Sequence, residues 1–228
     1  MSTNIEQPTP HTAAEGQEGA ATCLLSSAYF PPVQWMQKLH RYGHAIVERC
    51  DNFTKQTYRN RCIIEGPDGP LTLTVPVEHG GVAKPTTGEV RVSEHGNWRH
   101  LHWNALVSAY EKSPYFFYYA DEFRPFYEQR FDRLVELNGA IVAKVCELLD
   151  LRPKIILAEN YHQSADGEQD LRELIRPKTD FRFDVDFTPS EYYQVFRQKL
   201  GFLPNLSIAD LLFNMGPESR LILKRSIV

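Results

Sequence analysis

The spacing of hydrophobic and polar residues in the first fifty positions predicts a strand, a helix and a second strand. Residues 23–27 form a short apolar run that suits a buried strand. From Val33 onward the apolar residues keep helical spacing, and Gly43 follows as a C-terminal cap. Residues 45–50 form a second apolar run of strand length. This order predicts a βαβ unit, in which the two strands are parallel and the crossover is right-handed.

A β-hairpin is predicted to follow the βαβ unit. Residues 57–64 suit a strand, residues 65–70 carry strong turn signals, and residues 71–77 alternate apolar and polar side chains. The alternation puts one set of side chains on the core face: Leu71, Leu73, Val75 and Val77. A further short strand is expected at residues 89–93.

The remainder of the chain is mostly helical by the same criterion. A strand is expected over residues 154–159, and helices are expected over residues 97–112, 126–150, 168–176, 190–199 and 207–215. In the first of these helices an inward stripe forms at successive i,i+4 steps: Trp98, His102, Leu106 and Tyr110. Ser207 and Gly216 are the expected caps of the last helix.

These elements predict an α/β fold. We expect a mixed sheet with an N-terminal βαβ unit and a β-hairpin, packed with helices, and a helical C-terminal half. Residues 23–228 contain no linker that would divide them, which favours a single domain. Residues 1–22 are rich in small and polar residues and are expected to form a disordered tail.

Composition narrows the class of protein. The 228 residues are 42% apolar and 24% charged with a net charge of −4, which indicates a soluble globular protein without a basic field for nucleic acid. The sequence has no apolar run of membrane-spanning length. The cysteines lack zinc-site spacing, so we expect buried free thiols in a reducing cytoplasm and no metal. They are Cys23, Cys50, Cys62 and Cys146.

The exits of the first two strands are the first candidate site. Parallel strands leave a sheet at the same edge, and ligands of α/β proteins bind outside this edge. Two groups of polar side chains should therefore meet there: Ser26, Ser27 and Tyr29 from the first strand, and Asp51, Asn52 and Lys55 from the second. Pro31 and Pro32 remove backbone donors at the helix start, which argues against a phosphate cradle.

Other candidates allow two interpretations each. Arg59 and Arg61 would share one strand face, either to hold a carboxylate or phosphate or to lie in solvent with scattered ion pairs. His102 would be a hydrogen-bonded core histidine or a general base. Asn138 lies on an apolar helix face and would clamp a loop or meet a ligand. The sequence has no nucleophile elbow and no HExxH motif.

Four segments together resemble one family. "SSAYFPPVQWMQKL" (26–39) follows a pattern QPYFxPxxGYFxL, and "CDNFTKQTYRNRCII" (50–64) follows DDVxYxKxxWxNRxxI. "WRHLHWNALVSAYEKSPYF" (98–116) matches a helix that ends in YxKxPYF, and residues 134–138 match LxxxN. These patterns are those of the WbqC-like proteins, which the chain resembles over about residues 23–150.

The chain departs from this family pattern at several positions. Ser27 replaces a glutamine, Arg49 and Cys50 replace an acidic pair, and Tyr58 replaces a tryptophan. The ending at residues 201–219 resembles that of a divergent branch.

The resemblance implies a cytoplasmic transferase of surface-polysaccharide (O-antigen type) biosynthesis. Such an enzyme would add an acyl or aminoacyl (glycyl) group to a sugar amine, with a sugar or an acyl donor as its small-molecule partner and with no nucleic acid or membrane. His102 would accept the proton, and the substrate-binding residues would be Tyr29, Lys55, Asn60, Arg61 and Tyr110. The alternative is a non-catalytic module that binds a nucleotide-sugar or a partner protein. The sequence names no cofactor and leaves the oligomeric state open.

Overall fold

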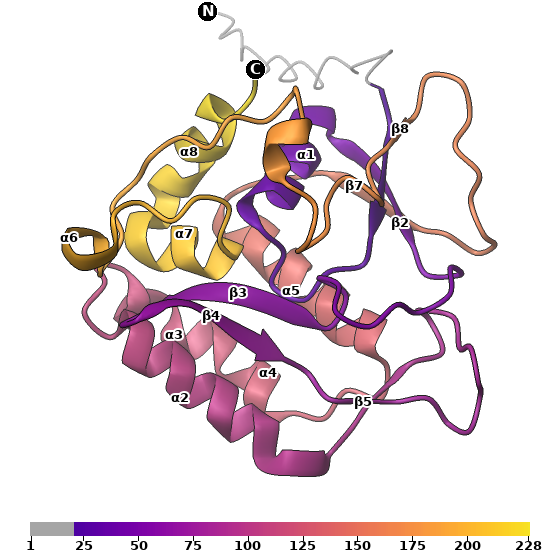
Figure 1. The fold of residues 1–228 in the computed structure, drawn as a ribbon, viewed down its shortest axis with the longest axis horizontal. Helices are drawn as coiled ribbons and strands as arrows, with labels where there is room; N and C mark the ends of the chain where they lie inside the picture. The colour runs from indigo at the N-terminus through magenta and orange to yellow at the C-terminus, as the bar shows by residue number, and fades with distance from the viewer. Residues whose placement is uncertain (1–20) are drawn as a thin grey trace, which may run out of the picture.

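The structure is a computed structural model that describes residues 21–228, and its fold is α/β as expected (Figure 1). The strands are β1 (Cys23–Ser26), β2 (His44–Glu48), β3 (Arg61–Gly66), β4 (Gly69–Thr74), β5 (Val77–Glu78), β6 (Arg91–Val92), β7 (Lys154–Leu157) and β8 (Gln169–Asp170). The α-helices are α1 (Val33–Tyr42), α2 (Trp98–Tyr110), α3 (Phe116–Phe123), α4 (Pro125–Glu128), α5 (Leu134–Leu148), α6 (Arg197–Leu200), α7 (Ile208–Met215) and α8 (Ser219–Arg225).

A parallel sheet with strand order β7-β2-β1-β8 lies in the upper right of the molecule as drawn in Figure 1. The predicted βαβ unit is β1-α1-β2, and Cys23 pairs with Ala45 in parallel register. Gly43 ends α1 at a φ of 66°, a left-handed conformation that favours glycine, and its N–H donates to the carbonyl of Leu39. The chain passes from β1 to its neighbour β2 on one side of β1, and it returns later to add β8 on the other side of β1. The direction in which strands are added therefore reverses between β1 and β8.

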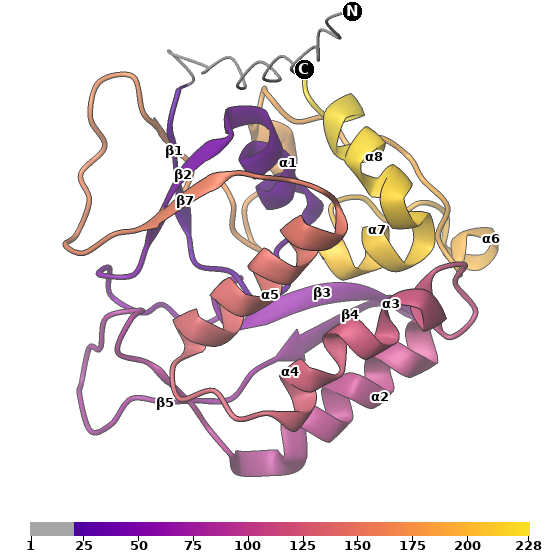
Figure 2. The same cartoon turned by 180° about the vertical axis from the view of Figure 1, so that it is seen from behind.

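The antiparallel strands form separate two-stranded sheets. The hairpin β3–β4 pairs Arg61 with Thr74, and the short strands β5 and β6 pair Val77 with Val92. The sheet expected to be mixed is therefore divided, because β3 packs against α2 and α7 and does not reach the parallel strands. Figures 1 and 2 show this hairpin between the parallel sheet and α2.

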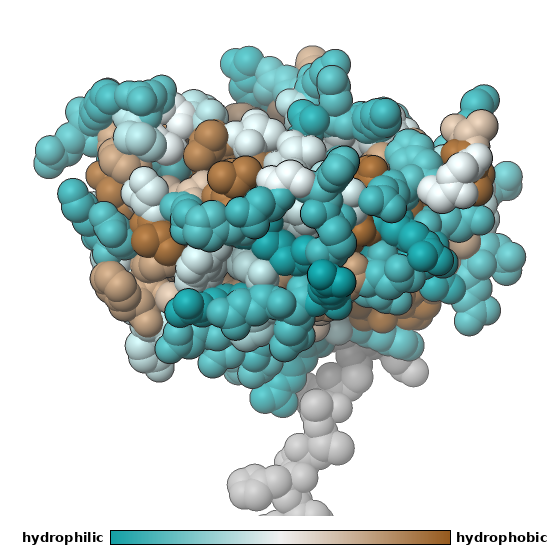
Figure 3. All heavy atoms as spheres, turned by 90° about the horizontal axis from the view of Figure 1, so that it is seen from below, coloured by the Kyte–Doolittle hydropathy of each residue, from teal (hydrophilic) through white to brown (hydrophobic). Residues whose placement is uncertain are grey.

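The helices close the core from several sides. α1 packs on α7 and α8, and α5 lies beside β7 (Figure 2). The predicted stripe on α2 is buried along its length, from Trp98 to Tyr110. Ser207 caps α7 as predicted, because its hydroxyl accepts the N–H of Ala209 at 3.2 Å. The surface seen from the side of α2 is mostly hydrophilic with separate apolar patches (Figure 3).

Three helical expectations were wrong or incomplete. Residues 126–150 are divided into α4 and α5, because the carbonyl of Asp132 accepts the N–H of Val92 and the N–H of Leu134 donates to Val90. Residues 168–176 do not form a helix, since residues 169 and 170 pair with β1 as β8. Residues 190–199 contain only the start of α6. Both α3 and α8 were not predicted.

The hairpin also differs from its prediction. β3 begins at Arg61 and not at residue 57, because the carbonyl of Tyr58 accepts the N–H of Tyr29 at 2.9 Å and residues 57–60 turn. Leu71, expected in the core, is 40% exposed, whereas Leu73 and Val75 are buried as predicted.

The remaining predictions concern the tail, the membrane and the thiols. Residues 1–20 of the predicted tail lie outside the described residues, and the carbonyl of Thr22 accepts the N–H of Gln169. Across residues 21–228, none of the helices has the length and apolarity to span a bilayer. All four cysteines are free, and burial raises the pKa of Cys23 and of Cys146 to about 12.

Candidate functional site

The exits of β1 and β2 meet, as the strand topology predicted. Arg59 joins them, because its guanidinium donates to the hydroxyl of Ser26 at 3.1 Å and forms an ion pair with the carboxylate of Asp51. Asp51 also accepts the hydroxyl of Thr87 at 2.5 Å. Arg59 is buried. Of its two interpretations, the structure shows an internal carboxylate partner and not a solvated strand face.

A second arginine binds carboxylates at the same edge of the sheet. Arg172 follows β8, and its guanidinium contacts Glu48 at 3.1 Å and Asp170 at 2.6 Å. Glu48 is the last residue of β2 and is fully buried, and its carboxylate also accepts the backbone N–H groups of Cys50 and His162. The hydrogen bond from Arg172 lowers the pKa of Asp170. A chain of charges thus connects β2 with β8.

Arg172 and Asp51, the partner of Arg59, line a polar pocket of about 520 Å³, which we call the carboxyl-edge pocket. It is lined by Asp51, Asn52, Thr54, Tyr161, Asp170, Arg172, Glu173 and Arg176. The guanidinium of Arg172 lies 5.1 Å from the ring centre of Tyr161, and this tyrosine is 56% exposed. The pocket lies outside the carboxyl ends of the parallel strands beside the reversal of strand order, where α/β proteins bind ligands.

A histidine with an oriented ring lies beside this pocket. His162 follows the pocket-lining Tyr161, and its Nε2 lies 2.7 Å from the carboxylate of Glu168. The side chain of His162 is 31% exposed. A carboxylate that holds one ring nitrogen fixes the orientation of the imidazole, which is the arrangement that an acid–base histidine requires.

The predicted catalytic histidine is a buried residue. Nδ1 of His102 lies 3.0 Å from the hydroxyl of Tyr29, which in turn lies 3.0 Å from the hydroxyl of Tyr127. Burial lowers the pKa of His102 to about 4, and a hydrogen bond to the backbone of Thr74 opposes this shift only in part. The imidazole is therefore neutral at pH 7. The hydroxyl of Tyr29 thus links this imidazole to the hydroxyl of Tyr127 in a buried hydrogen-bonded chain.

The predicted residue Tyr110 belongs to a buried acid cluster. Its hydroxyl donates to Asp210 at 2.7 Å and accepts the N–H of Glu65 at 3.1 Å. Tyr192 and Gln194 donate to the other oxygen of Asp210. Burial raises the pKa of Asp210 to about 6 and that of Glu65 to about 7. This cluster joins α2, β3 and α7, and its contacts are internal.

The other predicted residues lie in the loop before the β3–β4 hairpin and at its start. Asn60 is buried and donates to the carbonyl of Val75 at 2.9 Å, which fixes the start of the hairpin. Arg61 is half-buried on β3, and Lys55 is exposed in the preceding loop. The structure therefore brings Tyr29 and His102 together, whereas Lys55, Asn60, Arg61 and Tyr110 line neither the carboxyl-edge pocket nor the apolar pocket beside α5.

Sequence reasoning missed the residues that form the carboxyl-edge pocket beyond Asp51 and Asn52. Glu48, which pairs with the pocket-lining Arg172, was hidden in an apolar run, although a carboxylate at the last position of a parallel strand is a detectable signal. Asp170 and Arg172 were assigned to a helix that does not form. Tyr161 stood in a polar stretch without periodicity, and no sequence signal connected it to the sheet.

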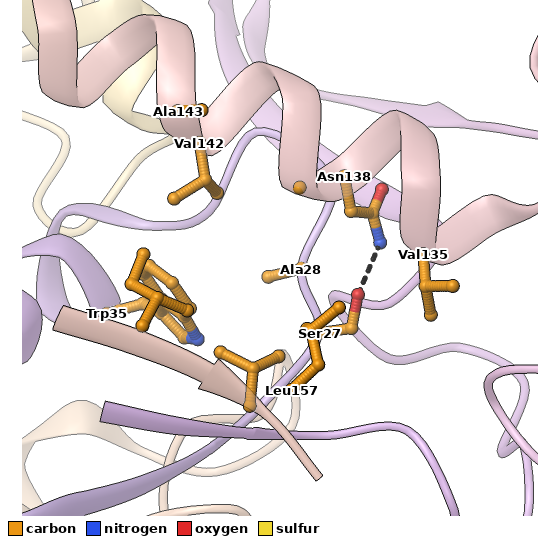
Figure 4. Close-up of a pocket in the computed structure, with 11 residues that line it drawn as sticks. Ser27, Ala28, Trp35, Val135, Asn138, Val142, Ala143 and Leu157 are labelled. Carbon is orange, nitrogen blue, oxygen red and sulfur yellow. Dashed lines mark hydrogen bonds between the residues drawn. The ribbon is translucent and has the colours of Figure 1, made fainter. Parts of the chain in front are cut away.

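An apolar pocket of about 250 Å³ lies on the other side of the β1 exit, between α5 and β7 (Figure 4). Ser27, Ala28 and Trp35 contribute to its lining, so part of the segment 26–35 borders it. Asn138 of α5 donates to the hydroxyl of Ser27 at 2.9 Å and to the carbonyl of Arg59 at 2.8 Å. Of the two interpretations of Asn138, these hydrogen bonds support the one in which it clamps a neighbouring loop.

The described part of the chain contains no cluster of side chains that could bind a metal ion. Among residues 21–228, no group of three histidine, cysteine, aspartate or glutamate side chains is placed to hold one ion.

Comparisons with known proteins connect the chain to one protein family and to an uncharacterized relative. Residues 26–177 match the family described as the WbqC-like protein family, a range that includes the carboxyl-edge pocket. The chain is also similar to "Uncharacterized protein Rv1507c" of Mycobacterium tuberculosis (strain ATCC 25618 / H37Rv). The two are 27% identical over 219 residues, which cover 86% of this chain and 94% of the relative. No solved structure matches this chain.

Proposed function

Since the chain belongs to the WbqC-like protein family, we propose that it is a transferase of surface-polysaccharide biosynthesis. In this proposal the carboxyl-edge pocket binds a sugar that carries an amine, and the enzyme transfers an acyl or aminoacyl group to that amine. The observation that carries the proposal is the position of this mixed-charge, aromatic-bordered pocket at the carboxyl ends of β2 and β8.

The side chains of the pocket support a sugar amine as its ligand. The carboxylates of Asp51, Asp170 and Glu173 suit the N–H groups of an amine and the hydroxyls of a sugar, because a carboxylate accepts several hydrogen bonds. The exposed ring of Tyr161 offers an apolar face for the sugar. Arg176 offers a guanidinium to a phosphate of an activated sugar.

His162 supports the chemical step as a general base. The amine nitrogen of the sugar attacks the carbonyl carbon of an ester or thioester donor, the new C–N bond forms, and the bond to the alcohol or thiol leaving group breaks. The proton of the amine passes to the imidazole of His162, which Glu168 orients, and then to the leaving group. The site residues predicted from the sequence, His102 included, stay a prediction that this proposal does not require.

One observation favours a binding module as the second candidate. Asp51 and Asp170 already pair with Arg59 and Arg172, so the charged floor of the pocket is satisfied without a ligand. Such a floor can hold a nucleotide-sugar in a fixed orientation without chemistry. The two candidates differ in a single property, which is conversion of the bound compound.

A binding and turnover experiment tests the proposal. Amino sugars, their nucleotide-linked forms and acyl donors are screened by calorimetry, and mixtures of hits are followed by mass spectrometry. We expect Tyr161→Ala to weaken sugar binding about tenfold or more, while Tyr193→Ala, at a comparably exposed tyrosine outside the pocket, leaves binding unchanged. His162→Gln should retain binding and lower turnover by about 10²- to 10⁴-fold. If Tyr161→Ala leaves sugar binding unchanged, the carboxyl-edge pocket is not the binding site. If a compound binds and is never converted, the binding module is favoured.

A further inference from the structure

β7 is an edge strand with apolar side chains and unpaired backbone groups. It ends the sheet order on the side opposite β8, and within residues 21–228 its only strand partner is β2. Ile155, Ile156 and Leu157 are 37%, 48% and 45% exposed. Apolar edge strands of this kind invite pairing with another strand, and proteins that stay monomeric usually protect them.

The hydrogen bonds of β7 fix which of its backbone groups are free. The N–H groups of Lys154 and Ala158 donate to the carbonyls of Gly43 and Val47 of the neighbouring segment. Because successive residues of a strand point their N–H and C=O groups in opposite directions, those of Ile155 and Leu157 point away from β2. These free groups are two residues apart, which is the spacing of an antiparallel ladder.

We propose that a second copy of this chain pairs with β7 in antiparallel register about a two-fold axis through Ile156. The N–H of Ile155 then donates to the carbonyl of the partner's Leu157. In return, the N–H of the partner's Leu157 donates to the carbonyl of Ile155. The symmetry repeats the same pair on the other side of the axis. Ile156 faces the partner's Ile156 as a non-hydrogen-bonded pair, in which side chains approach closely.

Apolar burial and charge both favour a second copy as the occupant. Ile155 and Leu157 line the apolar pocket beside α5, so pairing places the pockets of both copies on the same face of a continuous sheet. The segment is basic at its start, with Arg152 and Lys154, and acidic after its end, with Glu159. Antiparallel pairing puts the basic start of one copy beside the acidic end of the other. A symmetric interface needs such self-complementarity.

The mass in solution tests this interface. Wild-type protein is measured by light scattering from about 1 µM to about 1 mM, beside Ile156→Lys and the control Leu101→Lys, which changes an apolar side chain of α2 that is 59% exposed. We expect a wild-type dimer, a dissociation constant raised at least about 100-fold by Ile156→Lys, and no change in Leu101→Lys. Circular dichroism checks that the variants are folded.

Cysteine cross-linking tests the register. Ile156→Cys should form an intermolecular disulfide under mild oxidation, because a non-hydrogen-bonded antiparallel pair brings its Cα atoms within disulfide range. Lys154→Cys should not, because residue 154 faces the partner's residue 158. A wild-type monomer at every concentration overturns the proposal, as does a dimer that Ile156→Lys leaves intact. A monomer whose Ile155 and Leu157 amides are protected from hydrogen exchange also overturns it, since another segment then covers β7.

Discussion

The hydroxyl of Tyr29 lies 3.0 Å from Nδ1 of His102, and this contact joins the exit of β1 to the middle of α2. The rings are both buried, and Trp98 packs against the same imidazole with ring centres 5.1 Å apart. A neutral imidazole can accept the Tyr29 hydroxyl at Nδ1 and donate its remaining N–H to the backbone of Thr74. The contact holds the segment after β1 against the helical layer.

The first prediction is that His102 stays neutral down to about pH 5. Burial lowers its pKa to about 4, so the folded state binds fewer protons than the unfolded state between the two pKa values. Stability should therefore fall as the pH decreases from about 6.5 towards 4. Nitrogen-detected NMR titration of the imidazole measures this pKa directly. A midpoint at or above 6.5 would contradict the buried, hydrogen-bonded state.

The second prediction concerns Asp210, which Tyr110 and Tyr192 both contact at 2.7 Å. Burial raises its pKa to about 6, so the folded state retains a proton that the unfolded state releases. Asp210 should thus lower the free energy of unfolding by up to about 3 kcal/mol as the pH rises from about 4 to 6. Asp210→Asn removes this titration.

Urea unfolding at a series of pH values measures the effect of Asp210→Asn. The difference in unfolding free energy between variant and wild type should change in favour of the variant from about pH 4 to 6 and then level off. Asp166→Asn, at an exposed position, is the matched control for removal of a carboxylate. A difference that does not change with pH for Asp210→Asn would contradict the raised pKa of this carboxyl.

The third prediction is that the ion pair of Arg172 with Glu48 carries much of the stability of the carboxyl-edge pocket. Arg172→Met leaves the fully buried Glu48 carboxylate without its cation, which should cost about 3–5 kcal/mol of unfolding free energy. The comparison variant is Arg220→Met, whose pair with Asp150 is exposed and 3.7 Å apart. It should cost less than about 1 kcal/mol. Chemical denaturation measures both losses of unfolding free energy. Equal losses for the two variants would contradict the prediction that the buried pair contributes more than the exposed pair.

The fourth prediction is that Asn138 acts as a clamp. Asn138→Leu fits the apolar surroundings but removes the hydrogen bonds to Ser27 and to the carbonyl of Arg59. It should lower the unfolding free energy by about 2–3 kcal/mol, because buried partners lose their donor. Asn104→Leu, on the exposed face of α2, provides the matched comparison and should change it by less than about 0.5 kcal/mol. A clamp role is excluded if both variants unfold alike.

The sequence predicted those elements whose own pattern decides them. β1, α1 and β2 were readable because apolar runs, helical spacing and the Gly43 cap all agree. The α2 stripe was readable for the same reason. β8 was not, because it is a two-residue strand, Gln169–Asp170, that exists only through its pairing with β1. Its local sequence favours a helix, and tertiary contacts override that preference.

The location of the candidate site could be predicted from the sequence, but most of the residues that line it could not. Parallel topology correctly indicated that Ser26 and Asp51 would meet. It did not supply Arg172 or Tyr161, which reach the same edge from more than a hundred residues later in the chain. For His102 and Tyr110 the sequence predicted the residues but not their role. An inward helical stripe indicates which polar residues are buried, and it does not distinguish a structural core residue from a reactive one.

The pairing of Cys23 with Gln169 has a consequence for synthesis of the protein. A ribosome releases β1 early and its neighbour β8 only after most of the chain has been made, so one side of β1 must wait open during translation. Contacts of such sequence separation form slowly. A nascent chain that ends before residue 170 therefore has neither a finished sheet nor a complete carboxyl-edge pocket, and it is the species that chaperones would have to shield.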